Sequence, residues 1–218
     1  MSLVTAAVTA LAVGCAALPV AALPGVVGSF EPADGRPPRR AVPSGPALAA
    51  ITLGLLAAVA AVIYPHTGRL PAYLYLTVVG VLLAAVDLRV HRLPDRIVLP
   101  SYAVLAVLLA LPTLGEDAPG RWSRAVVAGA VAWLLYGGLR LLPGAGLGRG
   151  DVKLAGLLGM AVGWLGWPAV AVWFVATTLL SGLVAMALLL LRRVSRRDPI
   201  AYGPFLLTGA LVAVLCTG

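Results

Sequence analysis

Long apolar stretches separated by short polar breaks make up most of this chain. Their pattern predicts helices over residues 3–28, 46–64, 71–88, 97–114, 124–142, 152–163, 168–191 and 202–217. Most of these stretches reach or approach the roughly 20 residues that cross about 30 Å of hydrocarbon as helix. They lack the period-2 alternation of a membrane strand, and the breaks between them are rich in proline and glycine. We therefore expect an all-α integral membrane protein, a polytopic bundle of about eight membrane segments.

One segment, residues 152–163, differs from the others in length. It would rise about 18 Å as an α-helix, which is too short to span a bilayer alone. We expect it to tilt, to stay partly buried or to continue into its neighbour. The pattern predicts that the whole chain, 1–218, is a single polytopic membrane domain with a first membrane helix over 1–29, a short cytoplasmic loop over 30–45 and a core over 46–218.

Composition agrees with the segment pattern. Hydrophobic residues are 61% of the chain and the mean hydropathy is +1.01, whereas soluble domains are roughly 45–50% apolar. Two cysteines, Cys15 and Cys216, lie near opposite ends in apolar runs, so neither a disulfide framework nor a C-x-x-C metal site is predicted. We expect no metal and no cofactor.

The basic residues predict an orientation in the membrane. The formal net charge is +8, and alternate loops share the 16 basic residues very unequally. One side holds 13 of them, Arg36, Arg39, Arg40, Arg89, Arg92, Arg96, Arg140, Arg149, Lys153, Arg192, Arg193, Arg196 and Arg197, and the other holds Arg69, Arg121 and Arg124. By the positive-inside rule the first side is cytoplasmic and both termini lie outside. The charge therefore needs no nucleic-acid partner, and the lipid bilayer is the expected surrounding.

An alternative treats residues 1–24 as a cleaved signal peptide. No basic n-region precedes the apolar run, and cleavage would export Arg36, Arg39 and Arg40 against the charge pattern. The sequence favours a retained helix.

Two aspartates, Asp87 and Asp151, lie where the predicted topology meets the cytoplasmic boundary. Asp87 closes the apolar run 76–86 and Asp151 opens the run 152–162. A carboxylate at the edge of a bilayer costs a few kcal/mol, so it usually faces a partner, a cavity or water. Two neighbouring carboxyls can share one proton, so that one activates water while the other polarises a peptide carbonyl. The pair therefore predicts a shared site for peptide hydrolysis without a metal.

The residues flanking both aspartates resemble those of the type IV prepilin peptidases, membrane aspartyl peptidases with a G-x-G-D motif. Gly148-Arg-Gly150-Asp151-Val-Lys153-Leu is similar to the family's G-x-G-D-x-K-L signature. Asp87 precedes Leu93-Pro94-Asp95 as the family's first aspartate precedes its I/L-P-D/N element. Gly203-Pro204-Phe205, followed by Gly209-Ala210, is similar to the family's C-terminal segment. The resemblance covers roughly residues 75–215.

The resemblance implies a bacterial inner-membrane endopeptidase that removes the basic leader of pilin-like or pseudopilin precursors at the cytoplasmic face. Asp87 and Asp151 would be catalytic, with Gly148, Gly150, Lys153, Pro94, Asp95, Gly203 and Pro204 as supporting motif residues. Many bacterial members carry a cytoplasmic insert with paired C-x-x-C zinc motifs and are associated with N-methylation. Here that position holds the loop 30–45, so we expect a short form with peptidase activity and without zinc.

Structural roles compete with the catalytic ones at several positions. Asp151 alone could be a helix cap, and Asp95 is favoured as a cap of the helix near Arg96. Lys153 could orient Asp151 or simply anchor the chain at the lipid interface. Trp164 and Trp167 are typical of an outer interfacial belt.

A proton-coupled transporter that uses the two carboxylates is the alternative function, and an inactive scaffold for pilus or secretion assembly is a third. Both carboxylates fall on one membrane face and no repeat is evident, which disfavours the transporter.

Overall fold

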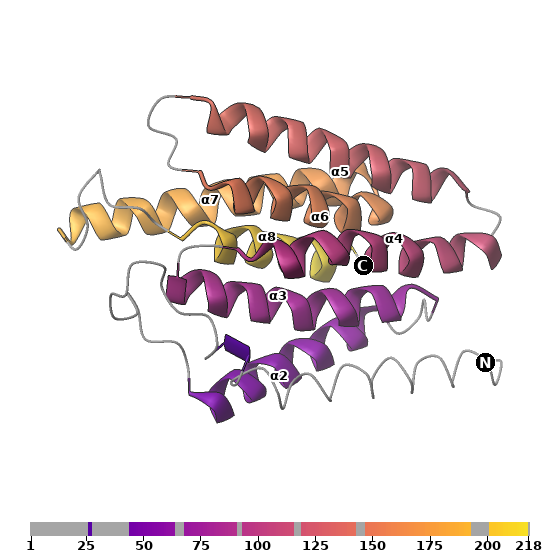
Figure 1. Ribbon diagram of the computed structural model, residues 1–218, viewed down its shortest axis with the longest axis horizontal. Coiled ribbons are helices and arrows are strands. Elements are labelled where there is room, and N and C mark those ends of the chain that lie inside the picture. Colours follow the sequence, from indigo (N-terminus) through magenta and orange to yellow (C-terminus); the bar gives the residue numbers. More distant parts are fainter. Residues whose placement is uncertain are drawn as a thin grey trace. The chain divides into compact units, whose positions relative to one another are not determined.

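Seven helices make up almost all of the part of the chain that the computed structural model describes, which is residues 26–27, 44–63, 68–90, 93–115, 119–142, 147–192 and 201–217 (Figure 1). They are α2 (Gly45–Ile63), α3 (Leu70–Val90), α4 (Asp95–Gly115), α5 (Pro119–Arg140), α6 (Arg149–Leu165), α7 (Trp167–Leu190) and α8 (Gly203–Thr217). Five of them, α2 to α5 and α7, are long and apolar enough to cross a membrane. The predicted all-α membrane fold is confirmed. The predicted first helix lies outside the described residues, except for residues 26–27.

The chain forms two compact units, Met1–Trp122 and Ser123–Thr217, which we call the N-terminal and C-terminal units. In the N-terminal unit α3 packs against both α2 and α4. It is the most buried helix there, with about two thirds of its span inside the protein. A hydroxyl contact joins α3 to α4, since Tyr75 Oη lies 2.9 Å from Ser101 Oγ.

In the C-terminal unit α6 is the central helix. Thirteen of its 17 residues are buried, and α7 and α8 both pack against it as well as against each other. By contrast, α7 buries the narrow stripe Ala169, Trp173 and Thr177, while most of its surface is apolar and exposed. Such a surface is suited to contact with lipid. Lipid tails are as apolar as these side chains, so no hydrophobic free energy is gained by burying the side chains in protein instead.

Small residues allow α5 and α6 to approach closely. A Cβ atom added at Gly159 would lie 2.6 Å from Ala132 Cβ and 2.9 Å from the Ala128 carbonyl oxygen. One added at Gly129 would lie 3.0 Å from the Gly156 carbonyl oxygen. Interfaces of this kind are typical of membrane helices, because packing at short range is the main force that holds them together.

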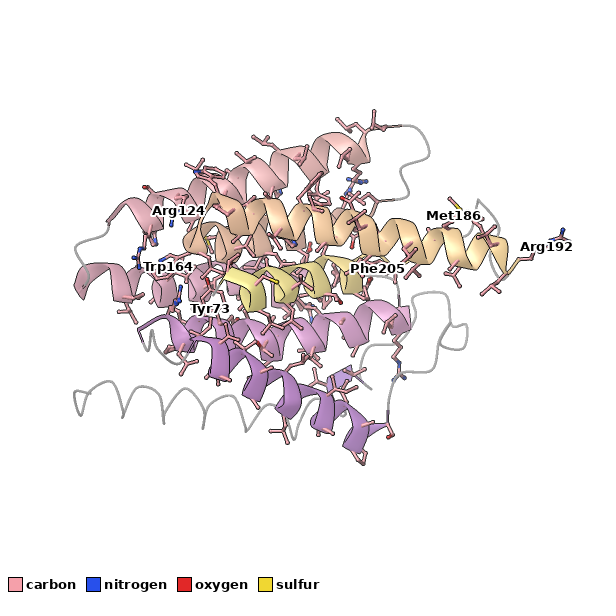
Figure 2. The ribbon with its side chains drawn as sticks, turned by 180° about the vertical axis from the view of Figure 1, so that it is seen from behind. Tyr73, Arg124, Trp164, Met186, Arg192 and Phe205 are labelled. Atoms are coloured by element: carbon pink, nitrogen blue, oxygen red, sulfur yellow. The ribbon has the colours of Figure 1, made fainter. Side chains whose placement is uncertain are left out.

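The length predicted for the sixth segment was wrong. Helix α6 runs from Arg149 to Leu165, so it starts three residues earlier than predicted and ends two later. Its last carbonyls have specific partners: the Gly166 N–H bonds to Val162 O at 3.2 Å, and Arg124 of α5 donates to Gly163 O and Trp164 O, each at 2.8 Å. Figure 2 shows Arg124 beside Trp164. The predicted break before α7 is confirmed at Gly166, whose φ of 148° suits glycine.

The two tryptophans at this turn have different surroundings. Trp167 is half exposed, as expected for a residue at the membrane interface, but Trp164 is 1% exposed. The interfacial role predicted for Trp164 was therefore wrong, and its ring belongs to the core of the C-terminal unit.

Candidate active site

Asp151 lies in the first turn of α6 and not in a loop before the helix. Gly148 is the N-cap residue and Asp151 the third residue of the helix. The Gly148 N–H donates a 2.9 Å hydrogen bond to Asp151 Oδ2. A carboxylate at this position pairs with one of the free N–H groups at a helix start and interacts favourably with the helix dipole. The helix start therefore holds the carboxyl in one position.

Gly148 itself leaves room for this contact. A Cβ atom there would lie 3.1 Å from Asp151 Oδ2, closer than nearly all carbon contacts. The backbone of Gly148 is extended, with φ −74° and ψ 158°, so the reason for glycine at this position is space and not a left-handed conformation. The first glycine of the motif thus fits against the carboxyl of its aspartate.

The surroundings of Asp151 favour its protonated form. The residue is 8% exposed, and helix α6 is not among the five candidate membrane spans. Burial raises the pKa of Asp151 above its ordinary value, because the charged form loses its hydration, while the hydrogen bond from Gly148 opposes this rise. A carboxyl whose pKa is raised in this way holds its proton more readily than a solvated one and is suited to act as a general acid.

Asp87 lies in the last turn of α3 and is 4% exposed. It follows directly on Ala85 and Val86, which belong to an apolar cluster with Val27, Leu48 and Val78. A charged group is seldom buried so completely without a partner or a function. Asp87 thus occupies the most buried helix of the N-terminal unit, and Asp151 that of the C-terminal unit.

The motif Leu93-Pro94-Asp95 lies at the start of α4. The Pro94 carbonyl oxygen accepts hydrogen bonds from the backbone N–H groups of Ile97 and Val98, at 3.0 and 3.2 Å. Asp95 is exposed and stands in the first turn of α4, a position where a carboxylate favours the helix start. This placement is compatible with the structural role that the sequence favours for Asp95.

The other motif residues lie at the starts of α6 and α8. Gly150 and Lys153 are partly buried in the first turns of α6, and Gly203 and Pro204 begin α8, with Gly203 buried. Because α6 packs against α8, the two motif segments belong to one packed unit. Asp87 and Asp151 belong to different units, so the pairing of their carboxyls stays a prediction, as do the roles of the supporting residues.

Sequence reasoning missed an aromatic cluster in the C-terminal unit. The ring of Tyr136 on α5 lies 6.0 Å from Trp173, 6.4 Å from Phe174 and 6.2 Å from Tyr202, measured between centroids. The aromatic residues are far apart in the sequence and carry no charge, so no local pattern indicates that they meet. Among the described residues, no three His, Cys, Asp or Glu side chains lie together as metal ligands would.

These features define a polytopic helical membrane protein in which, among the described residues, each of the two units contains one buried carboxyl group. The chain belongs to the type IV leader peptidase family, whose model matches residues 74–191, more than half of the chain. This stretch contains Asp87, Asp151 and the residues that flank them.

Curated relatives agree with the family assignment. The chain is 34% identical over 174 residues to a prepilin leader peptidase/N-methyltransferase of Aeromonas hydrophila, a match that covers 78% of this chain and 57% of the relative. A protein with the same description from Dickeya chrysanthemi is 41% identical over 144 residues, or 62% of this chain and 47% of the relative. The chain thus spans about half the length of these relatives. No solved structure matches it.

Proposed function

We propose that this protein is an aspartyl endopeptidase of the bacterial inner membrane that removes the leader of type IV prepilin-like precursors at the cytoplasmic face. Pilin-like and pseudopilin precursors are its substrates in this proposal, and Asp87 and Asp151 are its catalytic groups. The family assignment supports leader-peptide cleavage, and the relatives' names support prepilins as the substrate class.

The observation that carries the aspartyl mechanism is the state of Asp151. Its carboxyl is almost completely buried and oriented by the Gly148 N–H, and it stands in the G-x-G-D motif. Helix capping alone would not require burial, because capping residues work equally well at a solvated helix end. The second buried carboxyl, Asp87, supplies the partner that hydrolysis without a metal requires.

In the proposed reaction the two carboxyls share one proton. The ionised carboxyl takes a proton from water, which attacks the scissile carbonyl, while the protonated carboxyl donates a hydrogen bond to the carbonyl oxygen. The tetrahedral intermediate then collapses: the carboxyl that took a proton from water gives it to the leaving amine, and the carbonyl forms again as the other carboxyl keeps its proton. The burial that raises the pKa of Asp151 favours it as the protonated member in the resting enzyme.

Carboxamide variants test the proposal directly. Tagged precursor is co-expressed with the wild type, with Asp87→Asn, with Asp151→Asn and with the double variant. Loss of either carboxyl should lower the cleavage rate by about 10²–10⁴-fold, the usual contribution of one acid or base. Asp117→Asn, in a loop that the charge pattern places outside, is the matched control and should cleave at the wild-type rate. Substantial cleavage by the double variant would exclude the aspartyl mechanism.

Product mass tests the second activity in the relatives' names. The chain has two cysteines in all and no C-x-x-C pair, and residues 30–45, predicted from the sequence as a short loop, stand where the resemblance implies a zinc insert in many members. We therefore expect a cleaved product with an unmodified amino terminus. A product heavier by one methyl group would show that N-methylation does not depend on the insert.

A further inference from the structure

A buried hydroxyl on α5 has no hydrogen-bond partner. Tyr136 is 1% exposed, and its Oη atom bonds to no other group in the protein. The hydroxyl of Tyr202 interacts with it, but the two form no hydrogen bond of ordinary distance and angle. An unsatisfied buried hydroxyl destabilises the folded protein, and phenylalanine would avoid that cost with the same ring. Tyrosine at this position therefore requires an explanation.

The surroundings of the hydroxyl are otherwise aromatic. Trp173 and Phe174 of α7 and Tyr202 at the start of α8 lie around the Tyr136 ring. The indole N–H of Trp173 is already used, since it donates to Leu206 O at 3.0 Å. Tyr136 thus keeps a free donor in an apolar setting, where a hydrogen bond is stronger than in water.

The position of Tyr136 connects this donor with the two motifs of the C-terminal unit. Gly137, the next residue, packs on the first turn of α6, because a Cβ atom there would lie 3.7 Å from Val152 Cγ1. Val152 directly follows Asp151. On the other side, Tyr202 directly precedes the Gly203-Pro204 motif at the start of α8. Tyr136 therefore neighbours, along α5, the residue that packs on the first turn of α6, and its ring lies against the residue that precedes the C-terminal motif.

We propose that Tyr136 is a substrate-binding residue, whose hydroxyl donates a hydrogen bond to a main-chain carbonyl of the precursor segment that unwinds beside Asp151. The inference rests on the proposed peptidase function. A peptide bond within a helix has its carbonyl already paired, so a cleavable segment must release carbonyls near the scissile bond. Released in an apolar site, such a carbonyl requires a donor from the enzyme, and the unpaired hydroxyl of Tyr136 provides one.

The test compares Tyr136→Phe with Tyr75→Phe in the full-length protein. Steady-state cleavage of a purified prepilin-like precursor gives kcat and KM, and thermal unfolding gives Tm. For Tyr136→Phe we expect KM to rise about 2- to 10-fold, as for the loss of one neutral hydrogen bond, with little change in kcat. Its Tm should stay equal or rise, because the variant loses an unpaired buried hydroxyl.

Tyr75 provides the matched control, because its hydroxyl already has a partner in Ser101 and lies twelve residues before Asp87 on α3. Tyr75→Phe should lower Tm slightly and leave KM unchanged, the opposite pattern.

Three results would overturn the inference. An unchanged KM for Tyr136→Phe, while the wild type cleaves normally, would contradict it and leave the peptidase function standing. A lowered Tm with unchanged KM would show that the hydroxyl serves the resting structure, through water or Tyr202. Failure of the wild type to cleave any prepilin-like precursor would overturn both proposals together.

Discussion

At the scale of single residues, the contact between Gly148 and Asp151 determines where the motif carboxyl lies. The first motif glycine donates its N–H to the carboxyl and leaves no room for a side chain beside it. The sequence alone placed both glycines ahead of a helix that was predicted to start at residue 152. In the structure the two glycines of the motif have different positions: Gly148 is the N-cap residue, and Gly150 lies within the first turn of α6.

Gly148→Ala should therefore displace the carboxyl without unfolding the protein. A Cβ atom 3.1 Å from Oδ2 forces the carboxyl to move by a few tenths of an ångström, which weakens its hydrogen bond and its alignment. We expect precursor cleavage to fall about 10-fold, since small misplacements of catalytic groups have large effects on rate. Gly138→Ala on α5, where a Cβ atom meets nothing within 4 Å, is the control. Equal rates for the two variants would contradict this account of the motif.

Replacing Asp151 by asparagine should reveal the cost of its burial. Burial raises the pKa of Asp151 above the ordinary 3.8, so the folded protein binds its proton more tightly than the unfolded chain does. Stability then falls as the pH rises from about 3.8 through the raised pKa, and the loss is complete above it. Asp151→Asn keeps an oxygen for the Gly148 N–H and has no charge to bury. We expect the variant to be inactive, but with a higher Tm than the wild type at about pH 7.5.

The pH dependence of that difference is the decisive measurement. The Tm gap between variant and wild type should narrow as the pH is lowered and close below the ordinary pKa of 3.8, where the wild-type carboxyl is protonated in both states. A gap that is independent of pH would assign the effect to packing instead of charge.

At the scale of helices, α6 shows both the reach and the limit of the sequence pattern. The apolar run and its position were predicted correctly, because a continuous run of small and branched apolar residues in a membrane protein nearly always forms a helix. Its ends were wrong, because Arg149, Gly150 and Asp151 are polar or flexible residues that the pattern assigns to a loop. They are helical here because the cap contact of Asp151 favours the helix start, while the opposite end depends on Arg124 of another helix. A prediction made from the local hydropathy pattern cannot include such a contact between two helices.

Arg124 should accordingly be important for the stability of the C-terminal unit. With 17 residues, α6 rises about 25 Å, less than the roughly 30 Å of hydrocarbon, so its final carbonyls need donors from the protein. Arg124→Ala leaves two of them without their donor and should destabilise the unit by about 1–3 kcal/mol per carbonyl. Arg124→Lys should restore only part of the lost stability. Lysine keeps the positive charge and a donor, but it lacks the guanidinium fork that reaches both carbonyl oxygens.

Arg140→Ala is the matched control for this series, because Arg140 is an exposed arginine at the other end of the same helix. Thermal unfolding in detergent should separate the three variants. We expect Arg124→Ala to be the least stable, Arg124→Lys to be intermediate and Arg140→Ala to be the most stable. If the two alanine variants have the same Tm, the hydrogen bonds of Arg124 carry no net stability.

At the scale of the whole molecule, the all-α membrane class and the seven described helices followed from hydropathy, and the candidate residues followed from the motifs. The charge pattern places the two aspartates at one predicted membrane boundary, but the direct pairing of their carboxyls stays a prediction, since long-range pairing leaves no mark on local sequence. Asp87 and Asp151 are each buried in the most buried helix of their own unit. The Tyr136 cluster, drawn from three helices, was likewise invisible to sequence patterns.

The topology of the whole chain gives the last prediction. The 13-to-3 division of basic residues predicts a cytoplasmic site with both termini outside. Cys216 is exposed near the end of α8, so in a Cys15→Ser background a membrane-impermeant maleimide should label it in cells whose inner membrane is intact. Leu142→Cys, an exposed position after α5 made in a Cys15→Ser, Cys216→Ser background, should react after the inner membrane is permeabilised and not before. The opposite pattern would place the Asp151 turn, which follows the same loop, on the outer face, and a leader cleaved at the cytoplasmic side would then be out of its reach.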